Sequence, residues 1–177
     1  LFLQRLPSSF PLVLGFSLMS DVLSLRSYKA EEFDRACSIR NLAGEASRER
    51  FKKGFLASGT WGDHYLHLAI DLDGELVGDA QLRKCDATRP QGAWEMGLEF
   101  ASEHRGKGLG TSALGLIAEY AFLNGAHRVE GSTDAENIAM RRAFEKAGWN
   151  FEGILKALFI EDGKPCDYYS FAITKFD

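Results

Sequence analysis

The stretch Arg105–Thr111 has the clearest chemical potential in this sequence, because alternate glycines lie there among cations. Gly106, Gly108 and Gly110 leave the backbone free of side chains where a helical pattern begins. Such a turn can direct several backbone N–H groups at one anion, and the partial positive charge of a helix N-terminus adds to the attraction. Arg105 and Lys107 supply mobile positive charge beside it. The sequence therefore predicts a site for a pyrophosphate group.

Two other phosphate-binding motifs can be compared with this stretch by their spacing. A P-loop requires Gly-x-x-x-x-Gly-Lys-Ser/Thr, whereas Lys107 stands between two glycines and so does not fit. A dinucleotide loop requires Gly-x-Gly-x-x-Gly, and the sequence has Gly-x-Gly-x-Gly. Glu130 nevertheless follows Gly110 by twenty residues, where such a loop has its ribose-binding carboxylate. A dinucleotide-dependent oxidoreductase therefore stays open as an alternative.

Composition and charge narrow the class of protein. A length of 177 residues with 45% hydrophobic content suits one domain with one large core. A net charge of −4 gives no broad attraction to nucleic acid or anionic membrane, and neither is expected as a partner. The three cysteines and four histidines have no metal-ligand spacing. We therefore expect no disulfide framework, no metal and a cytoplasmic location.

The first residues read differently from the rest of the chain. The apolar run Phe10–Met19 is interrupted by Pro11 and Gly15 and is too short to span a membrane. Met19 is followed directly by a strand pattern. We expect residues 1–18 to be a non-native or disordered extension, and residues 19–177 to form a single domain.

Hydrophobic periodicity predicts the elements that must position the glycine turn. Strands are expected over residues 22–28, 64–72, 75–84, 94–100, 128–132, 151–160 and 167–175. Helices are expected over 30–40, from 45 to about 56, and over 108–124 and 137–147. Asp73-Gly74 marks a hairpin, Asn137 a helix N-cap, and Gly125 and Gly148 helix ends. The predicted order in this α/β protein is β-α-α-β-β-β-α-β-α-β-β, with the glycine turn after the fourth strand.

The order Arg-Gly-Lys-Gly-Leu-Gly-Thr resembles the acetyl-CoA loop of the GNAT N-acetyltransferases, whose pattern is Gln/Arg-x-x-Gly-x-Gly/Ala. With the element order, the resemblance covers Val22 to Lys175. Within that family the chain is similar to the RimJ/RimL type, the ribosomal-protein alanine N-acetyltransferases. The motifs that carry this similarity include Glu95-Met-Gly97, His127-Arg-Val-Glu130, Arg141-Arg142 and Gly148-Trp149. The resemblance implies a mixed, mostly antiparallel sheet of about seven strands, split between strands 4 and 5 and flanked by about four helices.

The same resemblance implies where acetyl-CoA, the expected cosubstrate, would bind. Its pantetheine arm would lie in the opening of the sheet, against the strand backbone from Leu98 to Phe100 and within reach of Asn137. Lys146 would approach the 3′-phosphate. The pyrophosphate would be held by the loop residues Arg105, Gly106, Lys107, Gly108, Leu109, Gly110 and Thr111.

The expected acceptor is a primary amine, which must be neutral to attack the acetyl carbonyl. At neutral pH an α-amine with a pKa of about 8 needs roughly 1 kcal/mol to lose its proton, whereas a lysine near 10.4 needs roughly 4 to 5 kcal/mol. The α-amine of a protein N-terminus is therefore the easier acceptor, and the RimJ/RimL resemblance favours it too. A small-molecule amine, such as a polyamine, an amino acid or an antibiotic, remains an alternative.

Glu95 is the expected general base, since it lies on the fourth strand where several GNAT enzymes carry a base glutamate. Glu99 lies on the same face by strand alternation and is the second candidate. No general acid is evident, because the resemblance places a proton donor at Phe144 or Met140. We expect direct attack in a ternary complex, with a non-catalytic acyl-CoA-binding module as the alternative. Tyr168 and Tyr169 are weighed as lining for the acceptor pocket, and a homodimer is expected from the family resemblance alone.

Overall fold

The computed structural model describes residues 22–62 and 64–177, and its elements follow the predicted order. The expectation for residues 1–18 lies outside the described residues. None of the described helices is both long and apolar enough to cross a membrane. The strands are β1 (Leu23–Arg26), β2 (Tyr65–Leu72), β3 (Glu75–Lys84), β4 (Ala93–Phe100), β5 (Arg128–Asp134), β6 (Asn150–Glu161) and β7 (Lys164–Thr174). The helices are α1 (Phe33–Ile39), α2 (Glu45–Leu56), α3 (Leu109–Leu123) and α4 (Ile138–Lys146).

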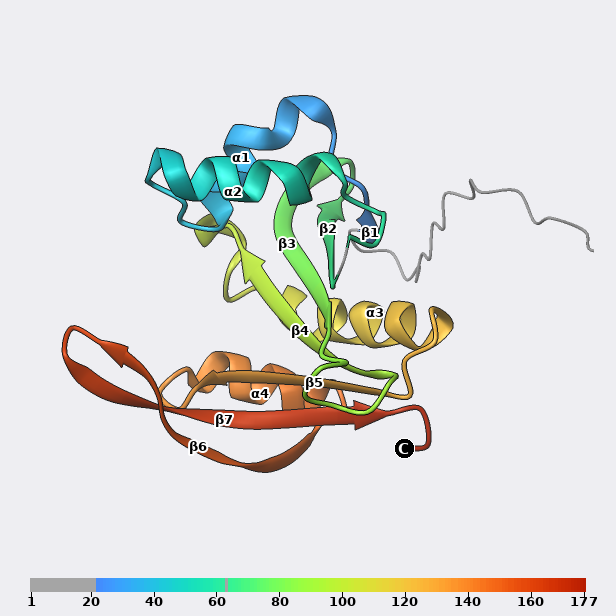
Figure 1. Cartoon of the computed structure of the whole chain (residues 1–177), viewed down its shortest axis with the longest axis vertical. Coiled ribbons are helices and arrows are strands. Elements are labelled where there is room, and N and C mark those ends of the chain that lie inside the picture. The colour runs from blue at the N-terminus through green and yellow to red at the C-terminus, as the bar shows by residue number, and fades with distance from the viewer. Residues whose placement is uncertain (1–21, 63) are drawn as a thin grey trace, which may run out of the picture.

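The strands form one sheet in the order β1-β2-β3-β4-β5-β7-β6. All neighbours are antiparallel except β4 and β5, which pair in parallel (Figure 1). The fold class expected from the sequence is therefore confirmed. The last hairpin is tighter than predicted, since Asp162 and Gly163 both adopt left-handed φ angles of 49° and 77° and close a two-residue turn. For this reason β7 begins at Lys164 and not at Asp167.

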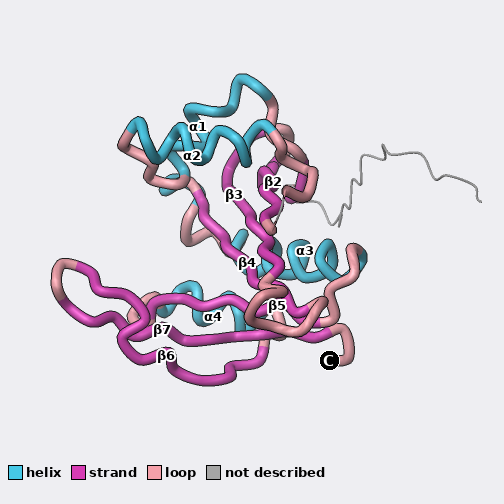
Figure 2. Tube along the Cα trace, viewed as in Figure 1, coloured by secondary structure: helices cyan, strands magenta, loops and turns pink. Residues whose placement is uncertain are grey.

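The sheet splits between β4 and β5, as expected. Only the stretches Ala93–Glu95 and Arg128–Glu130 pair across this boundary. Beyond them β4 continues to Phe100 beside β3, and β5 continues to Asp134 beside β7. The facing edges of residues 96–100 and 131–134 therefore have no strand partner within the described chain. Figure 2 shows the two halves of the sheet diverging from this point.

Two hydrophobic layers pack on the sheet, and the larger one holds its two halves together. The larger layer joins one face of the sheet to α3 and α4 and includes Leu82, Trp94, Ile117 and Phe171. The smaller layer lies beneath α1 and α2 and includes Cys37, Phe51 and Phe55.

Gly131 lets the two halves approach at the point of divergence. A Cβ atom there would lie 2.8 Å from Met96 Sδ and 3.1 Å from the Phe144 ring, so a larger residue would displace these two side chains. Glycine therefore permits the close packing at this position.

Candidate active site

The glycine turn has the backbone that an anion site needs. Gly106 and Gly108 have φ angles of 74° and 82°, in the left-handed region that favours glycine. A Cβ at either position would meet nothing within 4 Å, so the space in front of the turn is open. Helix α3 begins directly afterwards at Leu109 and directs its free N–H groups and dipole toward this space. Gly110 lies inside the helix and packs 3.6 Å from Ala143 of α4, measured from its ideal Cβ position.

Arg105 connects the turn to the end of β4. Its Nε donates to the carbonyl of Phe100 at 3.0 Å, and its Nη2 lies 3.5 Å from Glu99 Oε2. About half of the side chain remains exposed, with a relative accessibility of 54%. Lys107 is exposed in the turn. Two cations therefore stand beside the open space, as the sequence indicates.

The other residues predicted to bind the cofactor lie on both sides of the split. Leu98 and Phe100 pair with β3 but lie in the part of β4 that has no partner on β5, and Phe100 also packs in the core. Asn137 follows the end of β5 and is exposed. Its Oδ1 accepts from the N–H of Met140 at 3.1 Å, which confirms its predicted role as the N-cap of α4. Its contact with a cofactor stays a prediction.

Glu95, Gly97 and Glu99 lie on one face of β4. Their antiparallel partners on β3 are Arg83, Gln81 and Asp79, in a continuous register without a bulge. The expected common face of the two glutamates is thus confirmed. Because Gly97 has no side chain, a hollow remains between them, where a cavity of about 140 Å³ opens on the surface. It is lined by Tyr65, Gln81, Arg83, Glu95, Met96 and Gly97.

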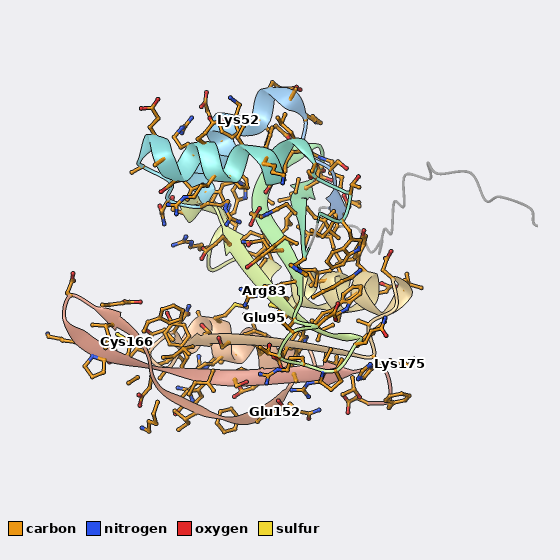
Figure 3. All side chains as sticks on the ribbon, in the orientation of Figure 1. Lys52, Arg83, Glu95, Glu152, Cys166 and Lys175 are labelled. Carbon is orange, nitrogen blue, oxygen red and sulfur yellow. The ribbon has the colours of Figure 1, made fainter. Side chains whose placement is uncertain are left out.

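Glu95 forms an ion pair with Arg83 across the two strands (Figure 3). The other carboxylate oxygen, Oε2, lies 3.7 Å from the thiol of Cys85. The hydrogen bond to Glu95 raises the pKa of Arg83 further, against the opposing effect of partial burial, so the guanidinium stays charged. Burial and the Glu95 carboxylate raise the pKa of the Cys85 thiol, which stays protonated at neutral pH. Glu95 itself is 37% exposed and can be reached from solvent.

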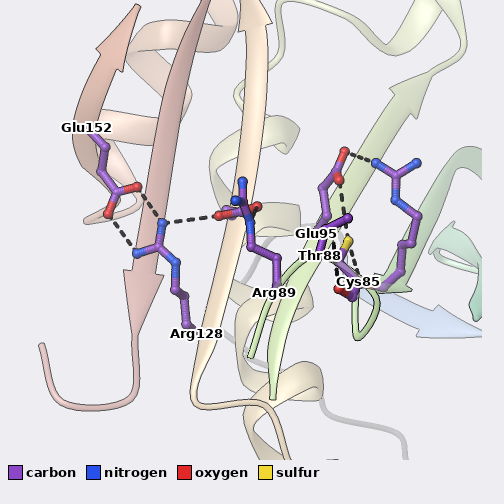
Figure 4. Close-up of polar contacts among 8 residues, drawn as sticks. Cys85, Thr88, Arg89, Glu95, Arg128 and Glu152 are labelled. Atoms are coloured by element: carbon purple, nitrogen blue, oxygen red, sulfur yellow. Dashed lines mark hydrogen bonds and ion pairs between the residues drawn. The ribbon is translucent and has the colours of Figure 1, made fainter. Parts of the chain in front are cut away.

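Glu130 is the β5 neighbour of Glu95 at the apex of the split. Its carboxylate accepts from Arg89 Nε at 3.0 Å and from Arg128 Nη2 at 3.2 Å, and Arg128 also pairs with Glu152 of β6 (Figure 4). The side chain is only 15% exposed. Glu130, the carboxylate that would bind the ribose of a dinucleotide, is therefore already paired with two arginines.

Glu99 lies beside a buried polar cluster. Burial raises the pKa of its carboxyl, Arg105 lowers it in part, and Asp79 raises it further. Asp79 is fully buried and accepts hydrogen bonds from Tyr28, Arg40 and Gln81. This cluster is not among the residues predicted from the sequence. An aspartate between apolar residues of a central strand is the signal that would have pointed to it.

The positions where the resemblance places a proton donor carry none. Phe144 is 1% exposed and stacks on Phe171 at 4.7 Å between ring centroids, and Met140 packs partly buried against the same core. Tyr168 and Tyr169 lie on β7 and do not line the cavity. Tyr168 packs against Phe159, and Tyr169 lies under the guanidinium of Arg141. Away from Glu95, ligand atoms of Asp134, Glu161 and Cys166 lie within 4.8 Å of one another. The expected absence of a metal stays a prediction.

Comparison with known proteins gives the following matches. Residues 20–150 match the acetyltransferase (GNAT) domain family. The probable N-acetyltransferase YjcK of Bacillus subtilis (strain 168) is 34% identical over 95 residues, which are 53% of this chain and 52% of that protein. RimJ of Mycobacterium smegmatis, solved in complex with CoA-disulfide, has a TM-score of 0.71 at 22% identity, covering 88% of this chain and 83% of that chain. A variant of the spermidine N-acetyltransferase SpeG from Vibrio cholerae also has a TM-score of 0.71, at 18% identity, covering 86% and 94%.

These matches differ in what they establish. The family match covers most of the described chain, while the two solved structures are distant in sequence and show the shared fold alone. The chain spans about half the length of the curated relatives it matches.

Proposed function

The chain belongs to the GNAT acetyltransferase family, and from this premise we propose that it transfers the acetyl group of acetyl-CoA to a primary amine. The observation that carries the proposal is the opening between β4 and β5, which lies between the glycine turn and Glu95. One end of the opening offers an anion site and the other a carboxylate beside a cavity. A long cofactor with a phosphate end and a reactive end fits this order of sites.

In the proposed complex, the pyrophosphate binds the N–H groups of the glycine turn and the cations Arg105 and Lys107. The pantetheine amides pair with the free edge of β4 from Leu98 to Phe100, because the backbone groups that face β5 there have no strand partner. Asn137 reaches the same arm from the other side of the split. A neighbour of the same fold, RimJ, was solved with a CoA disulfide, which supports this assignment.

The proposed reaction is a direct transfer. The neutral amine attacks the acetyl carbonyl carbon, a C–N bond forms, and the C–S bond to CoA breaks. Glu95, directly or through one water, takes the proton from the amine nitrogen, and the CoA thiolate leaves and is protonated by water. Free N–H groups at the edge of β4 stabilise the oxyanion. No residue of this chain is assigned as general acid, because Phe144 and Met140 cannot donate a proton.

We further propose that the acceptor is the α-amine of a protein N-terminus. The low cost of deprotonating an α-amine favours it. The fold neighbours include RimJ and a ribosomal-protein-alanine N-acetyltransferase, and also the spermidine acetyltransferase SpeG. A small-molecule amine is therefore the second candidate. A cytoplasmic site of action is consistent with Cys37, Cys85 and Cys166, which are all free thiols.

Ligand-dependent thermal stability tests the cofactor assignment. We expect acetyl-CoA and CoA to raise the unfolding temperature, because a ligand that binds only the folded state stabilises by about 2.7 kcal/mol at one hundred times its dissociation constant. NAD at the same concentration is expected to leave the unfolding temperature unchanged. Stabilisation by NAD in place of CoA would support the oxidoreductase, and acetyl-CoA binding without turnover on any amine would support the acyl-CoA-binding module.

We also propose that the protein forms a homodimer through β6, the edge strand of the sheet. Six large apolar side chains of this strand are between 40% and 66% exposed. They are Phe151, Ile154, Leu155, Leu158, Phe159 and Ile160. Their β7 partners place Phe151, Ile154 and Ile160 on one face of the sheet and Leu155 and Phe159 on the other, so this edge is apolar on both faces. A second copy offers the same apolar edge strand across a two-fold axis.

The variant Phe159→Glu is expected to convert the dimer to a monomer, since a charge on a desolvated apolar contact is costly. Sedimentation equilibrium over a range of concentrations would measure this. Phe176→Glu is the matched control, because Phe176 is 77% exposed near the C-terminus and outside β6. A wild-type chain that stays monomeric at every concentration would contradict the proposal.

A further inference from the structure

The cavity over Gly97 carries two opposite charges side by side. Glu95 and Arg83 both line it, and they pair with each other across β4 and β3 (Figure 3). The remaining lining residues Tyr65, Gln81, Met96 and Gly97 carry no formal charge. The cavity as a whole is therefore neutral, with a distinct anionic and a distinct cationic side.

Arg83 is held in place by two contacts that leave some of its N–H donors available. Its Nη2 contacts Glu95, and its Nη1 donates to the hydroxyl of Tyr65 at 3.1 Å. A guanidinium has five N–H donors, so donors remain beyond these contacts to described residues. The side chain is 39% exposed, and its free donors can meet a ligand in the cavity. Oε1 of Glu95 pairs with Arg83. Oε2 makes a weak contact with the thiol of Cys85, at 3.7 Å.

An α-amine next to a carbonyl matches this pair of groups. In an N-terminal residue three bonds, N–Cα, Cα–C and C=O, separate the amine nitrogen from the carbonyl oxygen. The two atoms therefore lie about 3 Å apart. The amine can therefore face Glu95 Oε2 while the oxygen accepts from Arg83. A polyamine lacks this oxygen and would bring a second ammonium toward the guanidinium, where like charges repel.

We propose that Arg83 is a specificity residue that binds the carbonyl or carboxylate oxygen adjacent to the acceptor amine. Acceptors of the α-amino carbonyl class, meaning peptide N-termini and free amino acids, are then selected over polyamines and lysine side chains. This inference rests on the proposed acetyl transfer and adds the chemical class of its acceptor.

The test compares two acceptors in wild type and Arg83→Met, with acetyl-CoA saturating. One acceptor is a short peptide amide with a free N-terminal alanine, and the other is n-propylamine, which has the amine alone. Loss of a hydrogen bond to a charged group corresponds to about 10- to 100-fold in kcat/KM. We expect a loss of this size for the peptide beyond any change for propylamine. Removing Arg83 can also change the basicity of Glu95. That change affects both acceptors equally and cancels in the ratio of their kcat/KM values.

Arg89→Met is the matched control, since Arg89 pairs with Glu130 one strand away and does not line the cavity. Its peptide-to-propylamine ratio is expected to equal that of wild type. Arg83→Lys keeps the charge but lacks the planar guanidinium, so we expect an intermediate ratio. It replaces Arg83→Met in the test if that variant does not fold. An equal loss for both acceptors, or a wild-type preference for spermidine over the peptide, would overturn the inference while leaving acetyl transfer intact. Absence of transfer to every amine would instead overturn the proposed function, and this inference with it.

Discussion

Gly108→Asp is expected to raise the dissociation constant for acetyl-CoA by at least about 100-fold, because it puts a carboxylate where the pyrophosphate binds. Two like charges about 4 Å apart repel by about 4 kcal/mol near a protein surface. Space is open in front of Gly108, so the new side chain would project into the anion site and not into the core. Isothermal titration calorimetry with CoA and acetyl-CoA would measure the change.

Two variants separate charge from backbone strain. Gly108→Asn has the same shape as the aspartate, tolerates the left-handed φ of 82° and is neutral, so we expect a weakening of about 10-fold or less. Gly125→Asp adds the same charge beyond the C-terminal end of α3, where φ is 103°, and should leave CoA affinity unchanged. Equal weakening by aspartate and asparagine at position 108 would show that no anion binds there.

Glu95→Gln is expected to lower kcat by about 100- to 1,000-fold, within the range for loss of a general base. The substitution keeps the size of the side chain and one oxygen that can accept from Arg83. The dissociation constant for acetyl-CoA should therefore change less than about twofold, since the pyrophosphate site lies at the other end of the opening. Steady-state kinetics with a saturating peptide acceptor, together with calorimetry, would separate the two effects.

Glu99→Gln is the matched control for this prediction. Glu99 lies on the same face of the same strand but beside Arg105 and Asp79, outside the cavity lining. We expect its kcat to stay within about threefold of wild type, because a remote carboxylate contributes little to proton transfer. If Glu99→Gln lost the activity and Glu95→Gln kept it, the base would be Glu99, the second candidate from the sequence.

Local patterns were sufficient to predict most of the fold. Hydrophobic periodicity places the helices, and the glycines at 125 and 148 end α3 and α4 with left-handed φ angles. The turn at Asp73-Gly74 closes the first hairpin as predicted. Each of these features depends on neighbours along the chain, so the sequence itself carries the signal.

The environment of the site could not be predicted in the same way, because it depends on strand register. Arg83 meets Glu95 because β3 and β4 pair without a bulge, and Glu130 of β5 meets Arg89, which lies in the loop between β3 and β4. Arg128 bridges to Glu152 across β7, which separates β5 from β6 in the sheet. A shift by one residue would place these side chains on the opposite face. The sequence therefore indicates Glu95 but not the cation that accompanies it.

The most direct test of amine acetyl transfer is the release of free CoA thiol by the wild-type chain, measured with acetyl-CoA and a peptide that has a free N-terminus. We expect release that depends on the peptide, saturates with its concentration and is accompanied by an acetyl group on its α-amine. A peptide with a blocked N-terminus should give only the background hydrolysis of acetyl-CoA. Thiol release at the same rate with and without any amine, or none in either case, would contradict the proposal that this chain is an amine acetyltransferase.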